Sequence, residues 1–300
     1  VGRFNVDQHN DQQLSSVGLK IKRDFSQVGG IEVKNHIKAL SLSAPNGIRI
    51  RSFDLDKVNN IVVGTTSPHS TVDINLVRDG NQGKEIVILI RNPDGSVKAT
   101  DKNDVGVFDL NGIPQKFTIK SFPASNVKVR FDILVDRSGS MAHVIANVRT
   151  AITLLMDRLP KKARCRVTSF NDTYVRHSKN YQSCMSRLHK INTIKAGGDT
   201  DIYQPLFDTY TELERLKDEL TAVVIITDGV GSSNISREKM MRRKSSPTYV
   251  YWLGDYEEKR LKGIADTFIY GRKDVGRLLK NYVQRIGNAV SHQQVISTNP

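Results

Sequence analysis

The sequence predicts two domains of different fold class. Residues 28–124 form a smaller all-β, sandwich-like domain, and residues 127–290 form an α/β domain with a doubly wound, mostly parallel sheet. Two observations support this division. Short alternating stretches separated by turn sequences fill the first range, whereas apolar strands alternate with amphipathic helical patterns in the second. A polar N-terminal arm, residues 1–27, precedes them, and a C-terminal tail, residues 291–300, follows.

The β-rich domain is predicted from alternation and turn chemistry. Sequences such as Asn92-Pro93-Asp94-Gly95 separate its apolar stretches and are typical of tight turns. The pattern nominates no functional residue in this domain, so either an interaction module or a spacer fits it. The predicted strands are Ala39–Leu42, Ile48–Phe53, Ile61–Val63, Val72–Val77, Glu85–Ile90, Val105–Asp109 and Lys116–Phe122.

The α/β domain is organised around a buried strand that ends in a polar turn. The apolar run Ile133–Val135 leads to Asp136, and the hydroxyls of Ser138 and Ser140 follow before a helical pattern starts near Val144. In open α/β sheets, ligands bind at the carboxyl ends of the strands. Carboxylate and hydroxyl oxygens suit Mg²⁺, Mn²⁺ or Ca²⁺. Taken alone, this turn fits helix capping by Ser138 equally well.

The rest of the α/β domain continues the alternation of strands and helices. Two of its turns are polar again: Gly197-Gly198-Asp199-Thr200 precedes a helix, and Thr227-Asp228-Gly229 closes a buried strand. We predict strands at 164–170, 174–176, 222–227, 248–253 and 268–270, and helices at 144–155, 185–191, 203–213, 261–265 and 275–286.

Three signatures in this domain resemble those of the von Willebrand factor A domain, also called the integrin I domain. They are Asp-Arg-Ser-Gly-Ser-Met from Asp136, Gly-Gly-Asp-Thr-Asp-Ile from Gly197, and Ile-Ile-Thr-Asp-Gly from Ile225. The resemblance covers 127–290 and implies a Rossmann-like fold with a metal-ion-dependent adhesion site. Its ligands would be Asp136, Ser138, Ser140, Thr200 and Asp228, holding Mg²⁺ or alternatively Mn²⁺ or Ca²⁺. Asp199 departs from the family's usual Gly-Gly-Thr pattern.

The resemblance implies recognition of a protein partner and no enzymatic activity. A metal held by few direct carboxylates would capture an acidic side chain of that partner, in cell adhesion or complex assembly. A secreted or cell-surface setting is favoured over the cytoplasm. Hydrolysis at the metal is the weaker alternative, because the ligand set is dominated by hydroxyls and no histidine pairs with a serine or cysteine in a catalytic order.

Charge provides a second functional alternative, which is polyanion or nucleic-acid binding. The net charge is +14, and residues 126–300 carry 29 basic and 18 acidic residues, a net charge of +11. Part of this excess is the basic run of Arg237, Lys239, Arg242, Arg243 and Lys244. That run would suit an acidic partner beside the metal or a phosphate group, but a solvated helix face is the preferred interpretation.

Two remaining features bear on the compartment. Cys165 and Cys184 are the only cysteines, and they are either buried apolar residues or a disulfide pair. No apolar run reaches the ~18 residues of a membrane span, so none is predicted.

Overall fold

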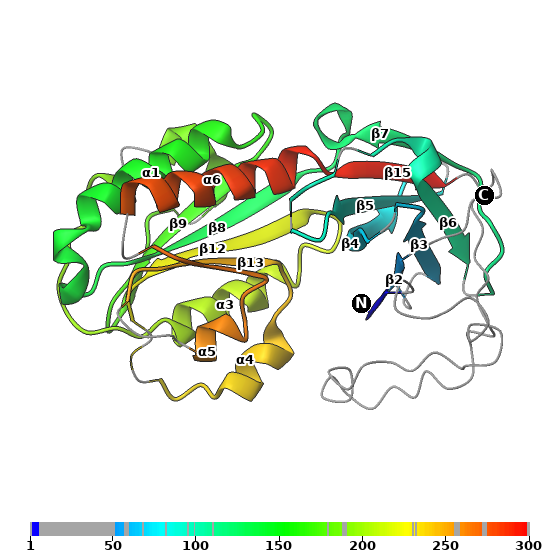
Figure 1. The fold of residues 1–300 in the computed structure, drawn as a ribbon. Coiled ribbons are helices and arrows are strands. Elements are labelled where there is room, and N and C mark those ends of the chain that lie inside the picture. The colour runs from blue at the N-terminus through cyan, green and yellow to red at the C-terminus, as the bar shows by residue number, and fades with distance from the viewer. Residues whose placement is uncertain are drawn as a thin grey trace. The chain divides into compact units, whose positions relative to one another are not determined.

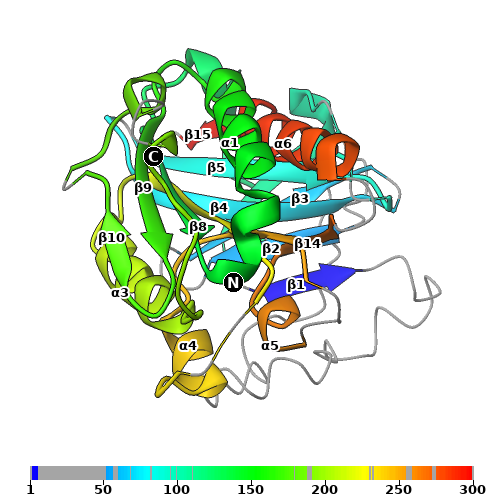
Figure 2. The same ribbon diagram turned by 90° about the vertical axis from the view of Figure 1, so that its left-hand side faces the viewer.

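The computed structural model comprises two compact units, residues 1–126 together with 292–300, and residues 127–291. Figures 1 and 2 show the chain from two directions. The predicted strand at 39–42 lies outside the described residues. These are 2–5, 52–56 and 60–298, apart from 188–190, 255–258, 272–274 and the single positions 68, 82, 95, 99, 110, 179, 230 and 232.

The N-terminal unit is a sandwich of two antiparallel sheets. Apolar side chains from both sheets meet in one core, which includes Val63, Ile88, Val107 and Ile296. One sheet has the order β1 (Gly2–Asn5), β2 (Ser52–Asp56), β3 (Ile61–Thr65), β6 (Val105–Asp109), and the other β4 (Thr71–Asp79), β5 (Lys84–Arg91), β15 (Gln294–Thr298), β7 (Phe117–Ser121).

Strand β15 differs from the expected C-terminal tail. It lies inside the second sheet, antiparallel to β5 on one side and to β7 on the other. Val295 and Ile296 are completely buried there. The N-terminal unit is therefore discontinuous in sequence, because the strand that completes its sheet follows the α/β unit.

The α/β unit contains one mostly parallel sheet covered by helices on both faces. Its strand order is β10-β9-β8-β12-β13-β14, with β11 beside β9, and the pairs from β9 to β14 are parallel. The strands are β8 (Val129–Asp136), β9 (Arg164–Phe170), β10 (Tyr174–Arg176), β11 (Gln182–Ser183), β12 (Leu220–Thr227), β13 (Thr248–Trp252) and β14 (Thr267–Tyr270). The predicted fold class is confirmed.

Helices α1 and α6 cover one face of this sheet, and α3, α4 and α5 cover the other (Figure 1). Their bounds are α1 Ile145–Arg158, α3 Tyr203–Leu213, α4 Arg237–Arg243, α5 Lys259–Lys262 and α6 Val275–Ser291. Short 3-10 turns are η2 Lys102–Asp104, η3 Phe122–Ala124, η4 Gly139–His143 and η5 Cys184–Arg187. No helix in the described part of the chain is long and apolar enough to cross a membrane.

The core of the α/β unit explains why β8 and β12 are central. Their side chains are nearly all buried, as expected for parallel strands covered on both faces. On the α3 face, Leu134, Val223 and Ile225 pack against Leu206 and Tyr210 of α3. Cys165 of β9 forms a disulfide with Cys184, so the disulfide alternative for the two cysteines is correct.

Candidate functional site

The first polar loop follows β8, and its carboxylate is fully buried. The Asp136 side chain has no solvent exposure. Its Oδ1 accepts the backbone N–H of Ser138 at 2.7 Å, and its Oδ2 accepts the Thr227 hydroxyl at 2.5 Å. The Ser138 and Ser140 hydroxyl oxygens lie 3.1 Å apart. Both hydroxyls therefore lie beside the buried end of the strand.

The third polar loop follows β12 and meets the first directly. The Ser140 hydroxyl donates to Asp228 Oδ1 at 2.9 Å. Strands β8 and β12 are neighbours in the sheet, yet the chain leaves β8 toward β9 on the opposite side. The two loops thus flank the point where the winding direction reverses, which is where open α/β sheets bind ligands.

The second polar loop joins the other two through backbone contacts. The Gly139 N–H donates to the Gly198 carbonyl at 2.9 Å, and the Gly197 N–H donates to the Arg137 carbonyl at 2.7 Å. A methyl group on Gly229 would lie 3.3 Å from Thr200 Oγ1. The structure therefore brings Asp136, Ser138, Ser140, Thr200 and Asp228 to one edge of the sheet.

Glycine is required where the third loop passes under the second. Gly231 has φ of 66°, and a side chain there would lie 1.5 Å from the Thr200 carbonyl oxygen. No other residue fits such a contact at a positive φ without moving the loop. The close packing of Gly231 fixes the backbone that carries Thr200.

Two residues that support these loops, Thr227 and Asn171, were not assigned a role from sequence. Thr227 fixes Asp136, as described above. Asn171 donates through Nδ2 to the Gly197 carbonyl at 2.7 Å, and its own carbonyl accepts the Asp201 N–H at 2.6 Å. Asp201 accepts the N–H groups of Tyr203 and Gln204 at 2.9 and 3.3 Å, at the start of α3. Asn171 directly follows strand β9. A polar residue at the carboxyl end of a parallel strand is the sequence signal that could have identified it.

The electrostatics of this edge are unbalanced. Burial raises the pKa of Asp136 to about 6, against the lowering effect of its hydrogen bonds from Thr227 and Ser138, and the nearby charge of Asp228 adds to the rise. In the described part of the chain, no lysine or arginine forms an ion pair with Asp136 or Asp228. Two acidic groups therefore share a site whose other side chains are neutral hydroxyls.

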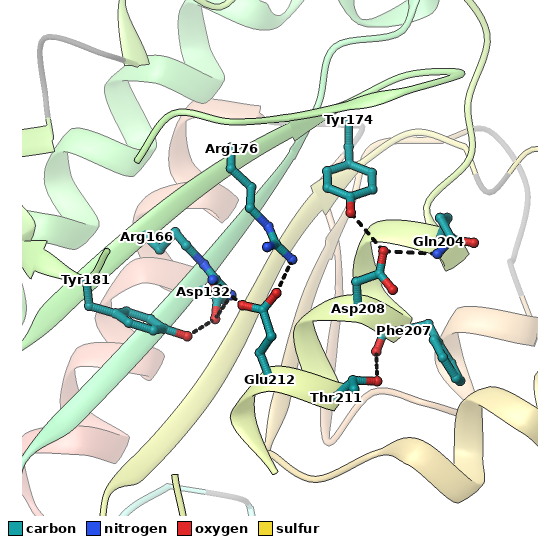
Figure 3. A network of polar contacts seen from close by, with 10 residues as sticks. All are labelled: Asp132, Arg166, Tyr174, Arg176, Tyr181, Gln204, Phe207, Asp208, Thr211 and Glu212. Atoms are coloured by element: carbon teal, nitrogen blue, oxygen red, sulfur yellow. Dashed lines mark hydrogen bonds and ion pairs between the residues drawn. The ribbon is translucent and has the colours of Figure 1, made fainter. Parts of the chain in front are cut away.

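A second buried carboxylate on the same strand has the opposite surroundings (Figure 3). Asp132 accepts two hydrogen bonds from Arg166, at 2.6 and 3.1 Å, and one from the Tyr181 hydroxyl at 2.5 Å. Arg166 also pairs with Glu212 of α3, which binds Arg176 at 2.6 Å. This group of five side chains, here called the Asp132 network, joins β8, β9 and β10 to α3.

The protonation states of the Asp132 network follow from burial and charge. Burial disfavours the Arg166 guanidinium, but the charge and hydrogen bonds of Asp132 outweigh it and raise the pKa of Arg166. Burial and the Asp132 charge both raise the pKa of Tyr181, so its hydroxyl remains a donor. The guanidinium carbons of Arg130 and Arg166 lie 4.7 and 4.8 Å from the centroid of the Tyr181 ring. Burial raises the pKa of Asp132, and the Arg166 charge and the hydrogen bonds from Arg166 and Tyr181 oppose this rise, so groups of the protein itself compensate much of its charge.

Comparison with known families decides the identity of this unit. Residues 132–230 match the profile of the von Willebrand factor type A domain, which includes all three polar loops. The chain contains a von Willebrand factor A domain. No curated protein sequence matches the chain significantly.

Several solved structures are similar to this chain with its A domain. A von Willebrand factor type A protein from Catenulispora acidiphila gives a TM-score of 0.49 at 15% identity, covering 79% of this chain and 52% of its own. Proximal thread matrix protein 1 from the mussel byssus, with a zinc-occupied adhesion motif, gives 0.48 at 16% identity, covering 61% and 49%. The ArnB paralog VWA2 from Sulfolobus acidocaldarius gives 0.45 at 14%, covering 75% and 54%. The chain spans about half the length of each of these proteins.

Proposed function

We propose that the A domain binds a divalent cation through Asp136, Ser138, Ser140, Thr200 and Asp228 and uses it to recognise a protein partner. A domains commonly mediate protein–protein interaction. The observation that carries the proposal is the convergence of two uncompensated carboxylates with three hydroxyls at the switch point of the sheet. The partner would supply a glutamate or aspartate to the cation, in adhesion or in the assembly of a complex.

The donor set fits a hard divalent cation. Mg²⁺, Mn²⁺ and Ca²⁺ prefer carboxylate and hydroxyl oxygens, and Mg²⁺ keeps several waters when it binds. The Ser138 and Ser140 hydroxyls hydrogen-bond to each other, and the Ser140 hydroxyl also donates to Asp228, so these oxygens already lie in one small region. A bound cation would neutralise the charge that Asp136 and Asp228 share there.

Recognition accounts for the site better than hydrolysis with Asp136 as the general base. A general base must reach the proton that it abstracts, and Asp136 is fully buried with both carboxylate oxygens engaged in hydrogen bonds. The buried carboxylate suits a structural role in holding the cation. The exposed Ser140 and the half-buried Thr200 and Asp228 leave the outer side of the site accessible to a partner.

The disulfide supports a secreted or cell-surface location. Cys165 and Cys184 are both buried and bonded to each other. Disulfides persist mainly in oxidising compartments. A protein that displays a metal-dependent recognition site there would meet partners at or outside the cell surface.

Affinity capture with and without chelator tests this function. The immobilised chain is incubated with extract from its native surroundings in Mg²⁺ or in excess EDTA. We expect partner capture in Mg²⁺ alone, and its loss in Asp136→Asn and Thr200→Ala. Asp157→Asn, an exposed acid on α1, serves as the control and retains capture. Undiminished capture in EDTA would contradict the proposal.

A further inference from the structure

The basic run singled out in the sequence forms helix α4 and the residue after it, and the structure divides its cations into two groups. Arg243 pairs with Glu214 at 2.8 Å, and Lys244 pairs with Asp266 at 2.7 Å. The other three cations, Arg237, Lys239 and Arg242, are exposed and form no ion pair with the carboxylates of the described residues. The Arg237 guanidinium lies against Gly263, where an added Cβ would be 2.0 Å from Nη2, whereas Lys239 and Arg242 lie about 60° apart on another side of the helix. We call Lys239 and Arg242 the α4 basic surface.

Part of the α4 basic surface is held in place by an aromatic ring. Lys239 and Arg243 are one helical turn apart, and both lie over Phe207 of α3, at 5.1 and 5.5 Å from the ring centroid. Glu238, the one acid of α4, leaves the helix with a net charge of +3. Lys239 is therefore held against α3.

Helices α3 and α4 follow the two loops that carry the candidate metal ligands Thr200 and Asp228. Helix α3 starts at Tyr203, directly after Thr200 and Asp201, and α4 starts after the loop that follows Asp228. The Ser236 hydroxyl accepts the Lys239 N–H at 3.2 Å and fixes that start. Both helices lie on the same face of the sheet (Figures 1 and 2). A ligand that extends from these loops over the face covered by α3 and α4 would meet α4.

We infer that the α4 basic surface is a second contact for the partner, and that it binds an acidic segment of a protein. This inference rests on the proposed function. A partner that presents one carboxylate to the cation would place neighbouring carboxylates against Lys239 and Arg242. Complementary charge at the rim of an interface speeds association and adds specificity.

The surroundings of Phe207 favour a protein over a nucleic acid. Proteins that bind single-stranded nucleic acid stack bases on exposed aromatic rings between their cations. Phe207 is the aromatic side chain in contact with the α4 cations, and Lys239 and Arg243 already lie over it. Cations of the protein therefore cover the Phe207 ring, and recognition of a ligand at α4 would rest on charge alone.

Binding of two defined polyanions tests the inference. A short fluorescent peptide rich in glutamate and a single-stranded oligonucleotide of equal charge are titrated with the full chain in Mg²⁺, followed by anisotropy. The test variant is Lys239→Gln with Arg242→Gln. The matched control is Lys128→Gln with Lys161→Gln, which removes two exposed cations elsewhere in the A domain. We expect peptide affinity to fall about tenfold in the test variant and less than about twofold in the control.

The outcomes separate this inference from the proposed function. Equal losses in both variants would show a general charge effect and overturn the inference. Tighter binding of the oligonucleotide than of the peptide, with loss in the test variant, would overturn the choice of an acidic protein. The titration is repeated in EDTA. If EDTA leaves peptide affinity unchanged while the variants still differ, the metal-dependent function fails and the α4 contact stands.

Discussion

Asp132 and Asp136 lie on the same strand and the same face of the sheet, and both are completely buried, yet among the described residues only Asp132 has a counter-ion. Asp132 receives two hydrogen bonds from Arg166 and one from Tyr181. Asp136 receives hydrogen bonds from a backbone N–H and from the Thr227 hydroxyl, both of which are neutral. Burial of a charge is costly unless a partner compensates it.

On the proposed function, this difference separates a carboxylate that maintains the fold from one that would help to hold a cation. The Asp132 network fastens α3 to three strands through charges that cancel within the protein (Figure 3). The edge near Asp136 instead keeps two negative groups, Asp136 and Asp228, beside hydroxyls. A cation from solution would supply there what Arg166 supplies to Asp132.

The largest expected effect is on stability, in the Asp132 network. Asp132→Asn leaves Arg166 buried without its main counter-ion, and loss of one partner of a buried ion pair costs about 3–5 kcal/mol. Chemical denaturation of the disulfide-bonded chain should show a loss in the free energy of unfolding in this range. Asp136→Asn in the same assay without metal should show no loss. A similar loss in the free energy of unfolding in both variants would contradict the difference drawn between Asp132 and Asp136.

The next expected effect is on the pH dependence of the metal-free protein. The pKa of Asp136 is about 6 in the folded state and 3.8 for the same carboxyl without these interactions. The folded state therefore binds the proton more tightly and is stabilised by protonation. This contribution is fully present below 3.8 and is lost as the pH rises through about 6. It amounts to about 3 kcal/mol.

Unfolding in EDTA over this pH range isolates the contribution of Asp136. As the pH falls through about 6, the free energy of unfolding of the wild type should rise relative to that of Asp136→Asn. In saturating Mg²⁺ the trend should reverse, because the cation requires the ionised carboxylate. If the free energies of unfolding of the two proteins change with pH in parallel in EDTA, the ionised Asp136 carboxylate does not destabilise the folded state.

The smallest effect is expected from Tyr181→Phe. The substitution removes the hydrogen bond from the tyrosine hydroxyl to Asp132 and keeps the ring between Arg130 and Arg166. A hydrogen bond to a charged group contributes about 1.5–3 kcal/mol, and the remaining bonds from Arg166 keep the loss near the lower value. Thermal unfolding measures it, and Mg²⁺ affinity should stay within about twofold. A large change in Mg²⁺ affinity would show that the two clusters are coupled.

The sequence predicted the A domain well because its elements follow local patterns. Buried apolar runs end in polar turns at Asp136 and Asp228, and the structure places both turns at one edge of the sheet. Strand β15 was missed because its only strong signal is the short pair Val295-Ile296, and its partners lie far away in sequence. Lys84, for example, binds the Thr298 hydroxyl across 214 positions.

The Asp132 network was within reach of sequence reasoning but was not predicted. Asp132 interrupts an apolar run in one strand, and Arg166 lies inside the next strand between Cys165 and Val167, in strands that we predicted to be parallel. Opposite charges in neighbouring buried strands indicate an ion pair. The register between β8 and β9, which sets Asp132 opposite Arg166, is a property of the folded sheet and has no marker in either segment.

Calorimetric titration of Mg²⁺ into the wild type and into Asp136→Asn tests the central claim most directly. The claim is that Asp136 and the hydroxyls around it hold a cation that replaces the missing counter-ion. We predict one saturable site in the wild type at neutral pH, and an affinity at least about a hundredfold lower in Asp136→Asn, with Asp132→Asn close to the wild type wherever it remains folded. Equal Mg²⁺ affinity in the wild type and in Asp136→Asn, or no binding of Mg²⁺, Mn²⁺ or Ca²⁺ to the folded wild type, would contradict the account.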